Sequence, residues 1–216
     1  MDTLQHILSK YNISYDGKTL FPIIISNFNR IDLARLTKEL NFKVGVEIGV
    51  AMGHYSEQLC IANPEMQLYS VDPWTPYRAY RDYTRKIKID GLYESAKARL
   101  AKYPNCKMVQ KFSMDALKDF EDESVDFVYI DGNHRFEFVT NDIAEWMKKL
   151  KIGGIMSGHD YTNVKKPSNT QVFEAVNGYT HAYSISPWFT TGYVMEANKD
   201  KDGSRSWFWV KEKYAW

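Results

Sequence analysis

The stretch VGVEIGVAMGHYSEQL, residues 44–59, joins an apolar run to a helical pattern through two glycines. The run FKVGVEIG is almost continuously apolar, which is typical of a strand buried on both faces of a parallel sheet. The segment HYSEQLCIA then has helical spacing. Gly49 and Gly53 allow the backbone to approach a ligand closely. The stretch therefore predicts a strand, a tight turn and a helix, with the acid Glu47 near the end of the strand.

The same alternation continues along the chain. Apolar runs predict strands at residues 66–72, 106–112, 124–132 and 153–161, and helical patterns lie at 91–103 and 139–151. This alternation predicts a doubly wound α/β fold with helices on both faces of the sheet. Residues 198–213 predict a turn that leads into an antiparallel edge strand. Residues 1–40 are predicted to form a helical N-terminal lid or extension, and residues 41–216 the main domain.

Composition excludes several classes of protein. The formal net charge of +1 argues against a general nucleic-acid-binding protein, which carries a basic excess. The chain has two cysteines, Cys60 and Cys106, so a disulfide scaffold is not expected and a reducing cytoplasm is. The N-terminus lacks the features of a signal peptide, and no apolar run approaches the roughly 20 residues that span a bilayer. We expect one large cytoplasmic domain without a membrane segment.

Polar and acidic residues recur where the predicted strands end. In a doubly wound fold, ligands bind beyond the carboxyl ends of the strands. The residues at those ends are Glu47 and Gly49, Asp72, Ser113 and Asp115, Asp131, and His159 and Asp160. A purely structural sheet does not need this pattern, so we expect a ligand site at this edge.

The turn after the first strand favours one class of nucleotide. A dinucleotide site has the pattern Gly-x-Gly-x-x-Gly, whereas this turn reads Glu47-x-Gly49-x-x-x-Gly53, and Glu47 would repel a phosphate. No Gly-Lys-Ser/Thr follows, which excludes a P-loop. S-adenosylmethionine (SAM) fits better, because its ammonium would be attracted by Glu47 and its carboxylate by the helix N-terminus. Asp72 could accept two hydrogen bonds from the ribose.

The chain resembles the class I SAM-dependent methyltransferases over residues 40–216. VEIGVAMG is similar to the first motif of that family, LYSVDPW to its ribose-binding acid, and FSMDAL to its adenine-binding turn. The resemblance implies a seven-stranded sheet of order 3-2-1-4-5-7-6 with strand 7 antiparallel. It also implies cofactor contacts from Ser113 and Asp131, with Met114 and Trp74 beside the adenine ring. Asp115 would accept a hydrogen bond from the adenine amino group, or instead cap a helix.

Two acids indicate a metal site. Asp131 and Asp160 follow adjacent predicted strands, and two neighbouring carboxylates repel each other unless a cation or a proton intervenes. The arrangement resembles the metal-dependent small-molecule O-methyltransferases. The catechol and caffeoyl-CoA branch has Asn where this chain has Tyr161, and the branch acting on antibiotic sugars has an acid where this chain has His159. The predicted ligands are Asp131, His159 and Asp160, holding Mg²⁺ or Mn²⁺; the alternative is that Asp160 caps a loop and His159 lies in the core.

His134 is the candidate general base. It follows Asp131 in DGNH, and the sugar-modifying enzymes have a histidine at a similar place. An imidazole titrates near neutral pH, so His134 could take the proton of an acceptor hydroxyl; it could also be a metal ligand or structural. Glu137 and Asp142 are expected to face solvent or to cap a helix, and Asp142 could instead orient a histidine.

The acceptor is less well defined. Residues 73–86 and 186–192 are candidate walls of its site; in the first stretch Tyr77, Arg78, Tyr80 and Arg81 could stack on a ring or only pack the lid. We expect SAM-dependent transfer of a methyl group to a hydroxyl of a small acceptor, with a sugar favoured, assisted by a divalent metal. The alternatives are a metal-free enzyme with a histidine base, or a SAM-binding module without catalysis. Nucleic-acid methylation is disfavoured, and assembly into a homo-oligomer stays open.

Overall fold

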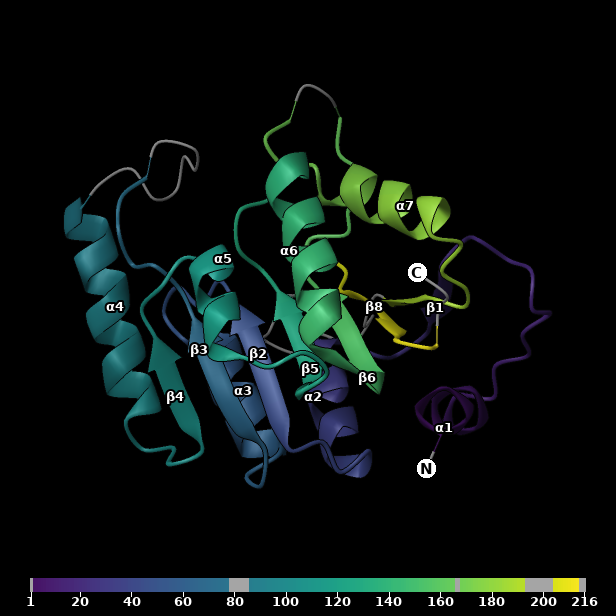
Figure 1. The fold of residues 1–216 in the computed structure, drawn as a ribbon, viewed down its shortest axis with the longest axis horizontal. Coiled ribbons are helices and arrows are strands. Elements are labelled where there is room, and N and C mark those ends of the chain that lie inside the picture. The colour runs from purple at the N-terminus through teal and green to yellow at the C-terminus, as the bar shows by residue number, and fades with distance from the viewer. Residues whose placement is uncertain (1, 78–85, 166–167, 193–203, 214–216) are drawn as a thin grey trace.

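The computed structural model describes residues 2–77, 86–165, 168–192 and 204–213. They form one sheet of eight strands in the order β1-β7-β8-β6-β5-β2-β3-β4 (Figure 1). The strands are β1 Ile23–Ile25, β2 Val44–Ile48, β3 Gln67–Val71, β4 Cys106–Val109, β5 Val125–Ile130, β6 Leu150–Gly158, β7 Phe189–Thr191 and β8 Trp207–Val210. The helices are α1 Thr3–Lys10, α2 Arg30–Glu39, α3 His54–Ala62, α4 Lys86–Leu100, α5 Ser113–Ala116, α6 Phe136–Lys149 and α7 Val172–Ala182, and a 3₁₀ turn, η2, covers Leu117–Asp119.

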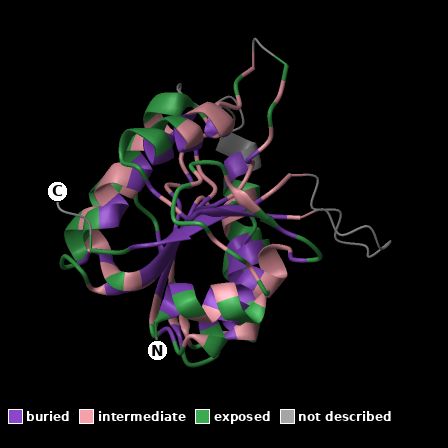
Figure 2. Cartoon of the chain, turned by 90° about the vertical axis from the view of Figure 1, so that its right-hand side faces the viewer, coloured by how far each residue is buried: buried purple, intermediate pink, exposed green. Residues whose placement is uncertain are grey.

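The sheet is buried on both faces. Along β5, Val128 and Ile130 pack on one side with α6 and α7, and Phe127 and Tyr129 pack on the other side with α2 and α3. This follows from the two-residue period of a strand, which sends successive side chains to opposite faces. Figure 2 shows the buried strands in the middle and exposed residues on the outer sides of the helices. Because both faces of the sheet are covered, the strands are almost continuously apolar in the sequence.

The predicted order of seven strands is confirmed, and β1 adds an eighth. Without β1, the spatial order of the seven strands is β4-β3-β2-β5-β6-β8-β7, with β8 antiparallel to both β6 and β7. The strand near the C-terminus is present, but its predicted position at the edge of the sheet is wrong, because β8 lies between β6 and β7. Trp207, Phe208 and Trp209 are fully buried there, so both faces of β8 carry aromatic rings that water cannot reach. The predicted turn at residues 198–203 lies outside the described residues.

The N-terminal region is mixed rather than wholly helical. α1 and α2 are helices as expected, whereas Ile23–Ile25 form β1, which pairs with β7 in parallel at one edge of the sheet. Ile7 of α1 and Leu33 and Leu36 of α2 are fully buried in the core below the sheet. The Thr3 hydroxyl donates a hydrogen bond of 2.7 Å to the Gly153 carbonyl at β6. This region is therefore part of the folded core, and its role as a lid stays a prediction.

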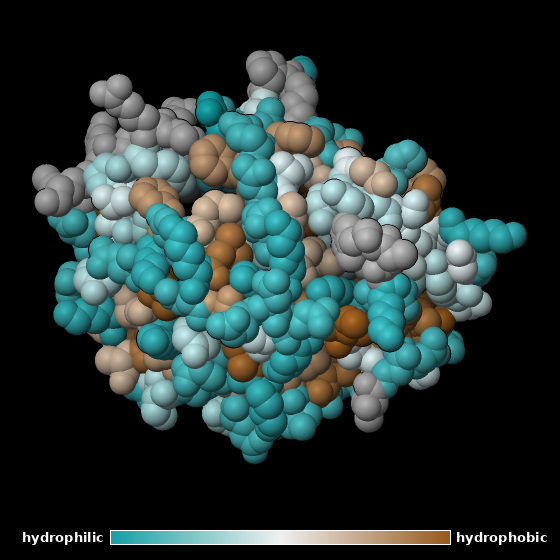
Figure 3. Space-filling model, viewed as in Figure 1, coloured by the Kyte–Doolittle hydropathy of each residue, from teal (hydrophilic) through white to brown (hydrophobic). Residues whose placement is uncertain are grey.

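Two further features concern the surface. None of the described helices combines the length and the apolar character needed to cross a bilayer. The face seen in Figure 3 is mostly hydrophilic, with hydrophobic atoms in separate small patches. α7 was not predicted from the sequence; it packs against α6 and contributes Val172, Ala175 and Val176 to the core.

Candidate functional site

A cavity of about 230 Å³ lies where the carboxyl ends of β2, β3 and β5 meet. In Figure 1 these strands end near α5 and α6. From β2 the chain goes to β3 on one side, and β5 lies on the other, so the cavity is at the switch point where ligands bind in this type of fold. Its walls are Ile48, Gly49, Ala51, Val71, Asp72, Pro73, Tyr77, Phe112, Ser113, Met114, Asp131, Gly132, Asn133, Phe138, Asn141 and Asp142.

The turn after β2 requires glycine. Gly49 has φ +88°, and a Cβ atom there would lie 2.2 Å from the carbonyl oxygen of Asp131. No side chain fits that gap, so Gly49 allows the turns after β2 and β5 to touch. Gly53, with φ +75°, precedes the first residue of α3 and packs against Leu100; it is not a wall of the cavity.

Asp72 ties two turns together. Its carboxylate accepts hydrogen bonds from the backbone N–H groups of Val50 at 2.9 Å, Ala51 at 3.0 Å and Trp74 at 2.8 Å. Asp72 is buried and lines the cavity. A carboxylate has about four acceptor positions. These backbone bonds therefore take part of the capacity that two ribose hydroxyl groups would need, and Asp72 holds the glycine turn in shape.

Glu47 lies beneath the turn rather than on the cavity wall. Its carboxyl group is buried and accepts a hydrogen bond from the Ser56 hydroxyl, which in turn accepts one of 2.9 Å from the Ser70 hydroxyl. Burial raises the pKa of Glu47 well above its ordinary value, and the Ser56 hydrogen bond opposes this only in part. Glu47 is not a wall of the cavity, and its contact with the ammonium of SAM stays a prediction. The acid beside Gly49 that lines the cavity is Asp131.

Trp74 and Asp115 lie away from the cavity. Trp74 is buried, donates from Nε1 to the Ala51 carbonyl at 2.9 Å and packs edge-on against Tyr93. Asp115 has a side chain that is 59% exposed and forms an ion pair of 3.0 Å with Lys118. Neither is a wall of the cavity, whereas Ser113 and Met114 are. Asp115 therefore faces solvent on the far side of the short helix α5.

Asp142 is the residue that the sequence interpretation missed. It was expected at the surface, but it is only 6% exposed, and it lines the cavity. The Ser113 hydroxyl donates to Asp142 Oδ1 at 2.5 Å, and Trp146 Nε1 donates to the Ser113 hydroxyl at 2.9 Å. Burial raises the pKa of Asp142 to about 7, opposed by the Ser113 hydrogen bond. The helical period indicated this position, since Val139, Ile143 and Trp146 form the buried face of α6.

The residues that were predicted to line the acceptor site do not all lie at the cavity. Tyr77 lines the same cavity, with its ring edge-on to Phe112 at 5.5 Å, and burial raises its pKa to about 12. Arg78, Tyr80 and Arg81 lie outside the described residues. Residues 186–192 include β7, and Trp188 and Phe189 are fully buried, so this part of the predicted wall is core.

A second group of titratable side chains meets beside Asp131. His134 Nε2 lies 3.4 Å from Asp131 Oδ1 and 3.2 Å from Asp160 Oδ2. His159 Nδ1 lies 3.5 Å from Asp160 Oδ1 and 4.0 Å from Asp131 Oδ1. Asp160 has φ +56°, a left-handed conformation that is rare outside glycine and that recurs at functional sites. The predicted convergence of the ends of β5 and β6 is therefore present.

The electrostatics of this group favour a charged pair. Burial lowers the pKa of His134, but the hydrogen bond to Asp131 and the charge of Asp160 outweigh burial and raise that pKa above its ordinary value. For Asp160, burial raises the pKa, and the hydrogen bond to His159 with the charges of both histidines holds it well below its usual range. An imidazolium at His134 thus relieves the repulsion between the two carboxylates.

Three ligand atoms could hold a metal ion. One from each of Asp131, His134 and Asp160 lies within 4.8 Å of the others. This group contains His134, where the sequence predicted His159. Two carboxylates with one imidazole fit Mn²⁺, Fe²⁺ or Zn²⁺ better than Mg²⁺. Tyr161 does not contribute, because its hydroxyl bonds to Asn177 at 3.1 Å in the core.

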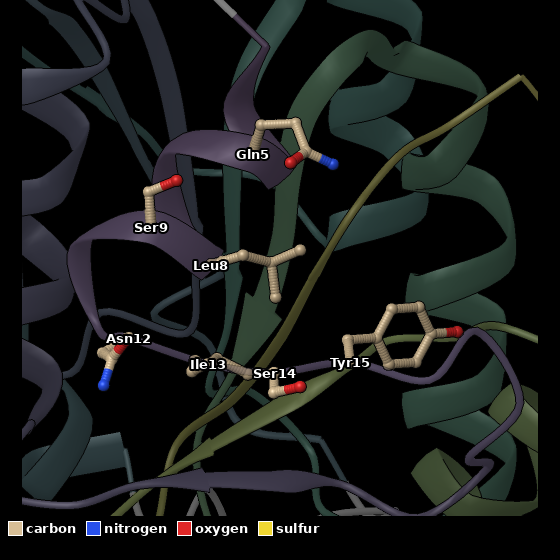
Figure 4. A pocket seen from close by; sticks show the side chains of 7 residues that line it. All are labelled: Gln5, Leu8, Ser9, Asn12, Ile13, Ser14 and Tyr15. Carbon is tan, nitrogen blue, oxygen red and sulfur yellow. The ribbon is translucent and has the colours of Figure 1, made fainter.

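A larger and more open cavity, of about 570 Å³, lies between α1 and the segment after it (Figure 4). Its walls are Gln5, Leu8, Ser9, Asn12, Ile13, Ser14 and Tyr15. These side chains include no carboxylate, imidazole or cation, and none is a predicted site residue. The chemistry is therefore concentrated at the carboxyl ends of the strands.

A model of a methyltransferase domain matches residues 46–161, from β2 to the end of the acid–histidine group. The chain belongs to the methyltransferase domain family. The resemblance to the class I SAM-dependent methyltransferases is thereby confirmed. The methyltransferase is 24% identical over 119 residues to the uncharacterized protein y4gI of Sinorhizobium fredii, and that match spans 55% of this chain but only 12% of the length of y4gI.

Solved structures share the fold of this methyltransferase. An O-methyltransferase from Bacillus cereus, in complex with SAH, has a TM-score of 0.59 and 12% identity, with 98% of this chain and 91% of that one covered. The O-methyltransferase TomG from Streptomyces achromogenes, involved in tomaymycin synthesis and bound to SAM, has a TM-score of 0.57 and 18% identity, with coverage of 84% and 79%. A putative caffeoyl-CoA O-methyltransferase from Staphylococcus aureus has a TM-score of 0.57 and 16% identity, with coverage of 96% and 90%.

Proposed function

We propose that this chain is a SAM-dependent O-methyltransferase that acts on a hydroxyl group of a small acceptor, with a sugar or glycosyl group as the favoured class. One observation carries the proposal: Asp131 belongs both to the cavity wall and to the acid–histidine group. A methyl donor in the cavity and a hydroxyl at the histidine would therefore be neighbours, as in-line transfer requires. The three solved O-methyltransferases of the same fold agree with this reaction class.

The cavity fits the cofactor. SAM has an apolar adenine ring, a ribose diol and a charged methionine end. Met114 and Phe112 offer apolar contact, Asp72 offers a carboxylate, and Gly49 leaves backbone exposed beside Asp131. When bound, SAM supplies a reactive methyl group on a sulfonium. The protein's own task is then to exclude water, to align the acceptor and to remove its proton.

His134 is proposed as the base. Its imidazole lies between two carboxylates, which orient the ring and stabilise the imidazolium that forms when a proton is taken up. The imidazole can take a proton only in its neutral form, and the raised pKa of His134 makes that form a stronger base, which is present at higher pH. His159 supports Asp160 from the other side and holds that carboxylate ionised.

A divalent metal is proposed as a partner of the same carboxylates. Asp131 and Asp160, with His134 or with water, would hold it, and a cation there would lower the pKa of an acceptor hydroxyl. A specific observation favours the metal-free alternative, since His134 already contacts both carboxylates and can neutralise them as an imidazolium. The two schemes differ in what Asp160 does.

The test is methyl transfer from labelled SAM to a panel of monosaccharides, glycosides and catechols, after EDTA treatment and after return of Mn²⁺ or Mg²⁺. Metal assistance predicts loss of turnover in EDTA, recovery with Mn²⁺, and loss of both turnover and Mn²⁺ binding in Asp160→Asn. The metal-free scheme predicts full turnover in EDTA, loss of turnover in His134→Ala, and most of the turnover kept in Asp160→Asn. Absence of SAM binding by calorimetry would overturn the proposal as a whole.

A further inference from the structure

The wall of the cavity contains a carboxyl group, that of Asp142, in which one oxygen is bonded to the protein and the other is not. Asp142 Oδ1 accepts the hydrogen bond of the Ser113 hydroxyl, whereas Oδ2 has no hydrogen bond to any side chain or backbone group in the described part of the chain. Asp142 is nonetheless only 6% exposed and lies on the cavity wall. A carboxylate oxygen on a cavity wall that has no protein donor is available to accept a hydrogen bond from a bound ligand.

Trp146 fixes the direction of the Ser113 hydroxyl. The indole N–H donates to Ser113 Oγ at 2.9 Å, and Trp146 is fully buried in the core, so it cannot turn away. Because the serine oxygen accepts from the indole, its own proton is directed to Asp142 Oδ1. The three residues therefore form a one-way chain of hydrogen bonds from α6 to α5 and back, which ends in an acceptor that faces the cavity.

The surroundings of Asp142 suit a flat apolar ring with an amino group on its edge. Phe112, Met114 and Phe138 line the same cavity with apolar atoms, and Asp72 and Asp131 are on the turns after β3 and β5. On the proposed function, the ribose and the methionine end of SAM would lie beside those two acids. We propose that Asp142 Oδ2 accepts a hydrogen bond from the 6-amino group of adenine, and that Asp142 thereby selects adenine over 6-oxopurines.

This assignment replaces Asp115, which the motif FSMDAL indicated. The Asp115 side chain is exposed, is paired with Lys118 and is absent from the cavity wall. Asp115 and Asp142 are thus two acids close to α5, one on each side, and only the second faces the ligand. Asp115→Asn is for this reason the matched control: it makes the same chemical change on the wrong side of the helix.

The experiment measures binding, without turnover. The dissociation constants of S-adenosylhomocysteine, S-inosylhomocysteine and the 6-deamino purine analogue are measured by calorimetry for the wild type, Asp142→Asn and Asp115→Asn. A pH of about 8.5 keeps Asp142 ionised, because its pKa is raised to about 7. The deamino analogue isolates the amino group, since the inosine compound also changes the proton on ring nitrogen N1. Thermal unfolding of each protein at the same pH establishes that it is folded.

The wild type should bind S-adenosylhomocysteine about tenfold or more tightly than either analogue, with the 6-oxo compound weakest, because a carbonyl oxygen would meet a carboxylate. In Asp142→Asn the amide oxygen stays with the Ser113 hydroxyl, so the amide N–H₂ faces the cavity. That group repels an amino donor and donates to a carbonyl, so the preference between adenine and the 6-oxo base should swing by about 100-fold. Asp115→Asn should keep the wild-type ratios.

Several outcomes would overturn the inference. The inference is wrong if the wild type binds the 6-oxo or the deamino compound as tightly as it binds S-adenosylhomocysteine. The same holds if Asp142→Asn folds and keeps the wild-type ratios, or if Asp115→Asn shifts them instead. If the wild type binds none of the three compounds, the proposed function fails first, and that result differs from binding without selectivity.

Discussion

At the residue scale, the site depends on groups whose surroundings change their chemistry. Glu47 lies in the glycine motif and Asp142 lies on α6, and burial raises the pKa of both carboxyl groups. Burial also acts to raise the pKa of Asp160, which follows β6, yet two histidines hold that pKa well below the usual range. The type of residue was visible in the sequence, whereas its charge state depended on which neighbours the fold supplied.

Gly49 should tolerate no side chain. In Gly49→Ala a methyl group would meet the Asp131 carbonyl at 2.2 Å in a backbone with φ +88°, so the turn must shift. We expect a loss of about 2–4 kcal/mol in the free energy of unfolding, together with loss of cofactor binding. Chemical denaturation and calorimetry measure the two effects.

The control for this change is Gly91→Ala. A Cβ at Gly91, within α4, meets no atom of the described residues within 4 Å. The substitution should stabilise the protein by about 0.5–1 kcal/mol, because alanine favours a helix over glycine. Equal effects at Gly49 and Gly91 would contradict the tight contact between the turns.

Asp142 should make stability depend on pH. Its carboxyl group has a pKa raised to about 7 in the folded protein, against an ordinary value of 3.8 when unfolded, so the folded state holds the proton more tightly. The stabilisation from that proton is fully present below the unfolded pKa and is lost as pH rises through the folded pKa. The wild type should therefore lose stability relative to Asp142→Asn between about pH 4 and pH 7.5, by on the order of 4 kcal/mol.

Urea denaturation of both proteins at several pH values measures this difference, and Glu47, which is common to both, cancels. A difference that stays flat, or that grows in favour of the wild type at high pH, would contradict the burial of a protonated Asp142. The same curves show whether Asp142→Asn is folded under the conditions of the binding experiment.

At the element scale, the N-terminal helices belong to the core although they precede the first strand of the motif. Leu33 of α2 is fully buried below the sheet, and Arg35, two residues further along the helix, has a side chain that is 66% exposed. Leu33→Ala should cost about 2–5 kcal/mol in the free energy of unfolding through the cavity it leaves. Arg35→Ala should change that free energy by less than about 0.5 kcal/mol.

Thermal or chemical unfolding compares these two variants. A region that served only as a detachable lid would give a different result, with Leu33→Ala close to wild type in stability and altered only in the Michaelis constant. A large loss of stability would show that residues 1–40 fold together with the sheet, and that truncating them would unfold the domain.

At the scale of the whole molecule, the cavity joins elements that are far apart in the sequence: the turn after β2, the end of β3, α5 and α6. A ligand that binds only the folded state stabilises it by about 2.7 kcal/mol at 100 times its dissociation constant. S-adenosylhomocysteine should therefore raise the free energy of unfolding of the wild type by that amount. Asp72→Ala should lose the effect, because it frees the N–H groups of Val50 and Ala51 that shape the turn.

Asp72→Ala should also be less stable without ligand, since it leaves those buried donors unpaired. The measurement is denaturation with and without ligand for each protein, and Asp115→Asn is the control that keeps the wild-type response. Full stabilisation of Asp72→Ala by the ligand would show that the carboxylate is needed neither for the ribose nor for the turn.

The resemblance to the class I SAM-dependent methyltransferases implied the order of the seven main strands. The sequence patterns alone determined the fold class, the glycine turn after β2 and the set of acids at the carboxyl edge of the sheet. These follow from local patterns: the period of apolar residues, and glycine where the backbone must turn. Only the tertiary structure decided that β1 joins the sheet as an eighth strand, that Asp115 faces solvent, that Asp142 lines the cavity and that His134 lies between Asp131 and Asp160. These depend on packing between segments distant in sequence, because side-chain burial and charge are set by neighbours that no local pattern specifies.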